Sequence, residues 1–106
     1  MSVKMLATLA AGSATDEASV EMTETPFLPG REVEAYIFTS ADMSGTDAVI
    51  IIESSPDDST WSTLLTMTGI GPTAGNITLD RYMRAGVETA AGTTAGEYTA
   101  FLRAGD

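Results

Sequence analysis

Glycine and proline residues divide this chain into segments too short for a stable helix, and this spacing limits its possible folds more than any other feature. An isolated helix needs about 12 residues before it becomes even marginally stable in water. Between the breaks, apolar and polar residues alternate with a period of two, which is the period of a pleated strand. We therefore expect an all-β fold. The breaks used in this argument are Gly12, Pro26, Pro29, Gly30, Gly45, Pro56, Gly69, Gly71, Pro72, Gly75, Gly92 and Gly96.

Two consecutive segments give the clearest strand signals. In Arg31–Ser40, Val33 and Ile37 share an aliphatic face, and the alternate positions are partly aromatic. Asp47–Ser54 contains a run of β-branched residues, which crowd a helix but suit a strand that is buried on both faces. We expect this second segment to be a central strand of its sheet.

A turn-forming segment follows the predicted central strand. Ser55–Ser59 combines a proline, which restricts φ, with Asp and Ser side chains that bond to nearby backbone amides. We expect a hairpin into Trp61–Met67. Trp61 and Leu65 lie four positions apart and so share one face of the strand, which we expect to point inward. The nearby aspartates fit no EF-hand spacing, so turn capping is the preferred interpretation.

The remaining strands are predicted on both sides of this hairpin. Gly69–Gly75 is expected to be a flexible crossing, and the last strand is expected to form a second hairpin with the strand before it. The small residues of Ala7–Ser19 indicate a mobile arm. The further predicted strands are Met5–Ala11, Ala18–Thr25, Ile77–Leu79, Arg81–Thr89 and Glu97–Arg103.

These elements predict one domain, because 106 residues leave little room for two cores. Residues 1–30 form an N-terminal strand or arm region of the same unit, and residues 31–106 form the core. The predicted fold is an antiparallel two-sheet β-sandwich, Ig-like or jelly-roll-like, of about seven or eight short strands. The predicted core comprises Val33, Ile37, Ile50, Ile52, Trp61, Leu65, Tyr82 and Leu102.

Composition argues against several functional classes. The formal net charge of −10 repels nucleic-acid phosphates and anionic lipid surfaces. The chain contains no Cys and no His, so thiolate chemistry and the side chain best suited to proton transfer near neutral pH are absent. No segment approaches the roughly 20 apolar residues that span a bilayer. We expect no catalytic residue, cofactor or metal ion, and no nucleic-acid or membrane partner.

Two local features have alternative interpretations. The glycines before Asn76 could suggest a phosphate loop, but the Lys-Ser/Thr ending is missing and strand-like sequence follows. Trp61 would stack on a sugar ring if it were exposed, whereas burial would make it a core residue, which is the favoured interpretation. A carbohydrate-binding module would need Trp61, Tyr36 or Tyr98 on a shallow exposed face.

The order of segments from residue 31 to residue 104 resembles that of small β-sandwich virion proteins of tailed bacteriophages, in particular head decoration or cement proteins. The likeness rests on the hairpin Val49–Leu64, the strand Arg81–Val87 and the glycine-bearing segment after it. It implies a non-enzymatic protein that binds the outer surface of a capsid in many copies and stabilises the shell. Similar patterns occur in tail or neck components and in bacterial adhesion or sugar-binding domains, which remain alternatives.

The resemblance also implies partners and a location. The partners would be the major capsid protein and further copies of this chain, and the virion would be assembled from protein made in the bacterial cytoplasm. The N-terminus resembles a signal peptide only weakly, which agrees with retention in that compartment. Besides the N-terminal segment, the expected contact loops contain Gly69, Gly71, Pro72, Gly75, Gly92, Thr93, Thr94 and Gly96.

Overall fold

A computed structural model describes residues 1–10, 15–39, 48–69, 72–89 and 97–105, and every regular element in these ranges is a strand. The predicted all-β class is therefore confirmed for the described part of the chain. The strands are β1 (Ser2–Ala10), β2 (Thr15–Asp16), β3 (Val20–Glu21), β4 (Glu32–Thr39), β5 (Val49–Ser55), β6 (Ser62–Thr68), β7 (Thr73–Thr78), β8 (Tyr82–Thr89) and β9 (Glu97–Ala104).

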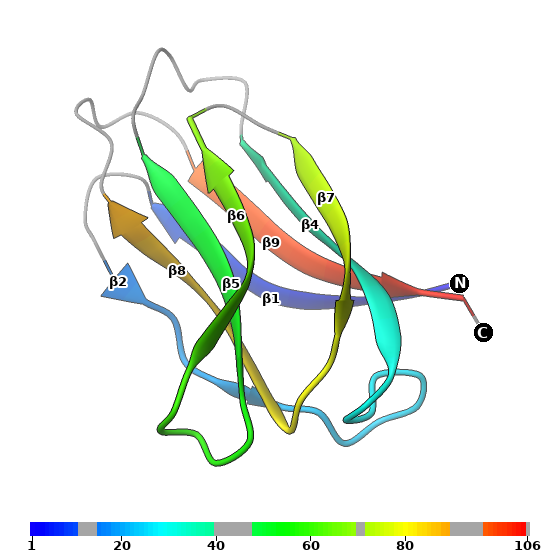
Figure 1. Cartoon of the computed structure of the whole chain (residues 1–106). Coiled ribbons are helices and arrows are strands. Elements are labelled where there is room, and N and C mark those ends of the chain that lie inside the picture. Colours follow the sequence, from blue (N-terminus) through cyan, green and yellow to red (C-terminus); the bar gives the residue numbers. More distant parts are fainter. Residues whose placement is uncertain (11–14, 40–47, 70–71, 90–96, 106) are drawn as a thin grey trace.

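The strands form two sheets that pack face to face, as predicted (Figure 1). One sheet has the order β1-β9-β4-β7, and the other has the order β2-β8-β5-β6, with β3 also paired to β8. All of these pairings are antiparallel. The predicted β5–β6 hairpin and the central position of β5 are both confirmed.

The short strands β2 and β3 act as one interrupted strand along β8. Between and beyond them, the Glu17 amide donates to the Ala85 carbonyl at 2.9 Å and the Met22 amide donates to the Arg81 carbonyl at 2.8 Å. With β2 and β3 counted together, the pairing is nested: β1 with β9, β2/β3 with β8, β4 with β7, and β5 with β6. This nested order is that of a jelly roll, one of the two predicted forms of sandwich.

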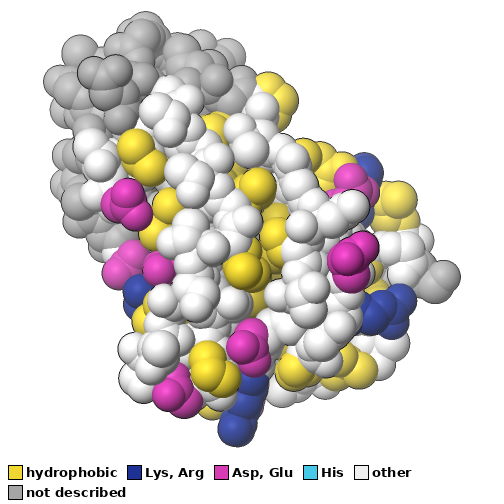
Figure 2. Space-filling model, viewed as in Figure 1, with side chains coloured by type: hydrophobic (Ala, Val, Ile, Leu, Met, Phe, Trp, Pro, Cys, Tyr) yellow, Lys and Arg dark blue, Asp and Glu magenta, His cyan; other side chains and the backbone are white. Residues whose placement is uncertain are grey.

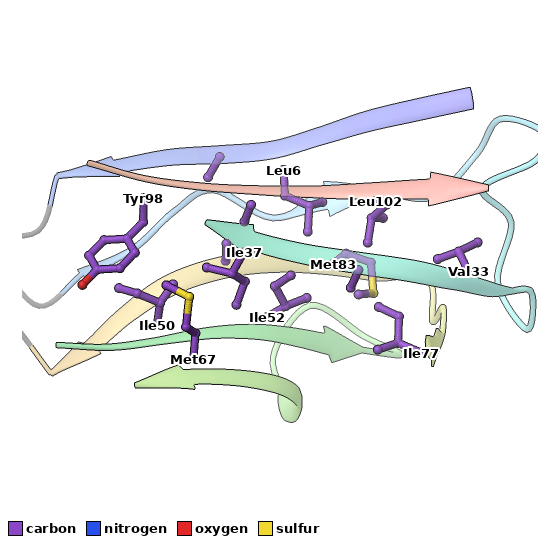
Figure 3. Close-up of a cluster of buried hydrophobic side chains, with 14 of the residues drawn as sticks. Leu6, Val33, Ile37, Ile50, Ile52, Met67, Ile77, Met83, Tyr98 and Leu102 are labelled. Atoms are coloured by element: carbon purple, nitrogen blue, oxygen red, sulfur yellow. The ribbon is translucent and has the colours of Figure 1, made fainter. Parts of the chain in front are cut away.

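The core lies between the sheets and is built from the inward-facing residues of both (Figure 3). Ile37 of β4 lies near Ile50 and Ile52 of β5, whereas Val33 lies at the other end of the core beside Ile77, and all of these side chains are buried. Ile51 is buried on the other side of β5, outside this cluster, so the prediction of a strand buried on both faces is confirmed. Further members of the core are Leu6, Met67, Ile77, Met83, Tyr98 and Leu102.

The prediction that Trp61 faces the core is wrong, because β6 contains a bulge. Leu65 lies opposite Ile52, but two residues earlier Thr63 lies opposite Glu53, so one residue of β6 has no partner. A bulge of this kind reverses the side on which all earlier residues of the strand point. Trp61 is half-buried on the outer side of the sheet, and Leu65 is only partly buried at the edge of the core.

Tyr82 was also predicted as a core residue, and this is wrong. In β8, Met83, Ala85 and Val87 point inward and are buried. Tyr82 and Arg84 occupy the alternate positions and are half-exposed on the outer side. Because side chains alternate along β8, the Tyr82 ring points to the same outer side of the sheet as Arg84.

Three predictions about connections are also corrected. The last strand, β9, pairs with β1 and β4 in the opposite sheet, so it forms no hairpin with β8. Strand β7 begins at Thr73, within the segment expected to be a flexible crossing. Strand β1 extends to Ala10 and pairs with β9, so the first residues of the expected mobile arm belong to a sheet.

The two sheets approach each other closely at the β6 and β7 edges, where Figure 2 shows hydrophobic atoms at the surface. Gly75 of β7 points inward, since it pairs with the buried Ala35. A Cβ atom at this glycine would lie 3.2 Å from Cδ1 of Leu65. The edges of the two sheets therefore come close together at this position.

Candidate interaction face

The outward side of the β1-β9-β4-β7 sheet carries large apolar side chains in adjacent strands. Met5 of β1 lies opposite Phe101 of β9, which lies opposite Tyr36 of β4. Antiparallel partners point to the same side of a sheet, so these side chains form one row. Val3 and Phe38 lie on the same side in the neighbouring rows. We call the surface formed by Val3, Met5, Tyr36, Phe38 and Phe101 the aromatic face.

Several of these side chains are more exposed than is usual for large apolar residues. The exposed fraction is 59% for Val3, 54% for Met5 and 40% for Phe38. Single exposed apolar residues are common on protein surfaces, but a contiguous group marks a site of interaction. The aromatic face is such a group, because Met5, Phe101 and Tyr36 are cross-strand neighbours and Val3 and Phe38 lie in the adjacent rows on the same side.

The rings of the aromatic face are held in a fixed arrangement. Tyr36 and Phe101 stack with ring centroids 4.9 Å apart and an interplanar angle of 5°. This separation matches the spacing of neighbouring strands, so the rings stand beside each other and cover one face of each. Phe38 meets Phe101 edge to face at 5.8 Å. The cluster is therefore ordered before any partner binds.

A polar network borders the aromatic face. The Arg103 guanidinium donates to Glu34 at 2.8 Å, and the Tyr36 hydroxyl donates to the same carboxylate at 3.0 Å. Arg103 also lies over the Tyr36 ring at 4.9 Å from its centroid. These hydrogen bonds, the Arg103 bond first, lower the pKa of Glu34. Desolvation, followed by the bond to Glu34, raises the pKa of Tyr36, so the phenol stays protonated and the carboxylate charged.

A shallow hollow of about 150 Å³ adjoins this network at the C-terminal end of β9. Its walls carry the paired Glu34 and Arg103, together with the exposed Glu32 and Asn76. The hollow is polar and is large enough for the tip of one side chain. Its complete lining is Glu32, Val33, Glu34, Asn76, Arg103, Ala104 and Gly105.

The outward side of the other sheet carries a different kind of cluster. Arg84 lies over the Trp61 ring at 4.0 Å from its centroid and donates to Glu53 at 3.0 Å. Its second nitrogen lies 3.4 Å from Asp16. The groups of this cluster thus contact one another, and one side of the Trp61 ring is covered by the guanidinium.

The turn between β5 and β6 is closed by Asp57, as the capping interpretation predicted. Its Oδ1 accepts hydrogen bonds from the amides of Thr60 at 2.8 Å and Ser59 at 3.0 Å and from the Ser55 hydroxyl at 3.0 Å. Led by the Thr60 amide, these donors lower the pKa of Asp57 to about 2. Asp58 follows with φ of 64°, a left-handed conformation that Asp tolerates better than most residues.

The predicted contact loops are only partly described. Gly69 lies at the end of β6, where its carbonyl accepts a hydrogen bond from the Tyr98 hydroxyl at 3.3 Å, and Pro72 is exposed. Gly75 lies in β7, is half-buried, and faces Leu65 on its inner side. Gly71, Gly92, Thr93, Thr94 and Gly96 lie outside the described residues. The N-terminal segment, also an expected contact region, contributes Val3 and Met5 of β1 to the aromatic face, whereas Tyr36, Phe38 and Phe101 were not among the predicted contact residues.

In the described ranges, no group of three or more His, Cys, Asp or Glu side chains is arranged to hold a metal ion. The same ranges contain no helix long and apolar enough to cross a membrane. No model of a known protein family matches the chain, and no curated protein sequence matches it significantly.

Proposed function

We propose that this chain is a structural protein of a tailed-phage virion, which binds the outer surface of the capsid and stabilises the shell. Jelly rolls occur in viral capsid proteins and in lectins, but a fold by itself does not identify a function. The observation that carries the proposal is the aromatic face, an exposed and internally ordered apolar surface on a compact β-sandwich. The sequence resemblance described above provides the link to decoration proteins.

The geometry of the aromatic face suits a protein partner. Aromatic residues are enriched in the buried centres of protein interfaces. Because Tyr36 and Phe101 are already stacked, binding immobilises little that was free, which lowers the entropic cost of association. On a symmetric shell the same contact repeats many times, and a subunit that bridges neighbouring capsid proteins gains affinity from each additional contact.

The same geometry does not favour a carbohydrate-binding module. That function needs a ring with a free flat side on a shallow surface. Tyr98 is fully buried, Trp61 is covered on one side by Arg84, and Tyr36 is stacked on Phe101 and contacted by Arg103. The three rings considered for sugar stacking are therefore engaged within the chain.

The proposal is tested on particles purified from the native source. Quantitative mass spectrometry should find the chain in a copy number close to that of the major capsid protein. Heads that lack the chain should rupture at a lower temperature than complete heads, and adding the purified chain should restore the difference. A few copies per particle would indicate a tail or neck component instead, and complete absence from particles would overturn a virion role.

A further inference from the structure

We infer that the aromatic face is the surface through which the chain docks, and that its partner is a protein surface with an apolar centre bordered by Lys and Arg. This inference rests on the proposed function and specifies where and how the shell protein is contacted. Its basis is the juxtaposition of an ordered apolar cluster with an acidic surround on one side of the β1-β9-β4-β7 sheet.

The two outer sides of the sandwich differ in what they offer a partner. On the β2-β8-β5-β6 side, Trp61, Arg84 and Glu53 contact one another through a charge-assisted hydrogen bond and a cation–π contact, and no large apolar side chain among the described residues of this sheet is exposed. On the aromatic face, Met5 and Phe38 remain about half-exposed after all contacts within the chain have formed. Among the described residues of the two sheets, the aromatic face therefore offers the larger exposed apolar surface for burial by a partner.

The charge of the chain indicates what borders the partner's apolar centre. Arg81, Arg84 and Arg103 each form an ion pair with a carboxylate of the chain. These three cations are therefore neutralised within the chain, and the formal net charge of −10 comes from the twelve other acidic side chains set against Lys4 and Arg31. In the view of Figure 2, Asp and Glu side chains are spread over the surface instead of gathering in one patch.

Acidic residues also stand at the border of the aromatic face itself. Glu32 of β4 is exposed in the wall of the hollow, and Glu97 of β9 is exposed at the opposite end of its strand. A Lys or Arg of the partner that entered the hollow would meet Glu32 there. A second copy of this chain would instead bring two surfaces of the same negative sign together, which opposes self-docking through this face.

The experiment measures binding of the purified full chain to shells from the native source that lack it. The test variant is the double substitution Met5→Ser/Phe38→Ser, and the matched control is Leu28→Ser. Leu28 is an apolar residue outside the sheets with an exposed fraction of 38%, close to the 40% of Phe38. Circular dichroism and thermal unfolding establish that each variant retains the fold.

We expect the double variant to bind the shells with an affinity at least about 30-fold lower than that of the unmodified chain, which is the loss typical of residues at the centre of an interface. Leu28→Ser should bind as the unmodified chain does. Glu32→Lys should weaken binding about tenfold at low salt, whereas Glu88→Lys, an exposed position on the other sheet, should change it little. The effect of Glu32→Lys should shrink as ionic strength rises.

The outcomes separate this inference from the proposed function. If the unmodified chain binds and the double variant binds equally well, the docking surface is wrong and the virion role stands. If the unmodified chain does not bind its own shells, both proposals fail. Sedimentation that finds a dimer for the unmodified chain and a monomer for the double variant would identify a second copy as the occupant and overturn the inference. Glycan binding that the double variant loses would overturn it in favour of a sugar.

Discussion

Two consecutive residues of β4 provide a sharp test of the sheet geometry. Ile37 points into the core and is fully buried, whereas Phe38 points outward and keeps 40% of its surface exposed. Replacing each with alanine removes apolar atoms from opposite sides of the same strand. We predict that Ile37→Ala strongly lowers the free energy of unfolding and that Phe38→Ala lowers it far less, although Phe38 loses more atoms.

The magnitudes follow from what each side chain contacts. Ile37→Ala removes three buried carbon groups, worth about 2.4 kcal/mol at about 0.8 kcal/mol each, and the remaining cavity adds to this. The expected total is about 3 to 4 kcal/mol. Phe38→Ala loses its edge contact with Phe101 and part of its burial, which together amount to about 1 kcal/mol. The loss from Ile37→Ala is a large part of the free energy of unfolding of most domains, which is roughly 5 to 15 kcal/mol.

The assay is equilibrium unfolding in urea, followed by circular dichroism, with the slope of the transition compared among the three proteins. An unchanged slope shows that the midpoint reports stability alone. Equal losses from the two substitutions, or a greater loss from Phe38→Ala, would refute the assignment of β4 faces and therefore the location of the aromatic face.

Three further predictions concern other parts of the fold. Arg84→Met removes the partner of the nearly buried Glu53 and should lower the free energy of unfolding by about 1 to 3 kcal/mol, whereas an unchanged urea midpoint would contradict the cluster. The lowered pKa of Asp57 contributes stability that is complete above about pH 5 and is lost as the pH falls toward about 2. Asp57→Ala should therefore be less stable than the unmodified chain at neutral pH and should lose less stability between about pH 5 and about pH 2. Parallel pH profiles would contradict this. Gly75→Ala should increase the free energy of unfolding by about 0.5 kcal/mol and raise the thermal midpoint slightly, because alanine suits a strand better than glycine and the partly buried Leu65 can shift away from the new methyl group. A decrease in the free energy of unfolding of more than about 1 kcal/mol would show that Leu65 cannot shift.

The local pattern of the sequence was sufficient to predict most strands, because alternation and turn residues act over short distances. The β-branched run of β5 predicted a central strand, and Asp57 predicted a capped turn into β6. The error at Trp61 had a local cause that alternation does not reveal. Whether a strand carries an extra residue depends on its partner, and the bulge became visible only from the pairing of Thr63 with Glu53.

Pairing between distant segments was the part that the sequence did not predict. A turn-like segment before β9 fits equally well a hairpin within one sheet and a crossing to the other sheet, and the chain makes the crossing. Alternation indicated that Tyr36 and Phe38 share a partly aromatic side of their strand. Their contact with Phe101 requires the register of β4 against β9, which joins residues far apart in the chain.

The most direct test of the docking and virion proposals is electron microscopy of native particles at a resolution that separates strands. We predict density for the sandwich on the outside of the capsid, with the aromatic face against the shell and the Trp61–Arg84 side directed to solvent. Density in which Tyr36 and Phe101 face the solvent would contradict the docking surface. Shells with no density for this chain would contradict the virion role.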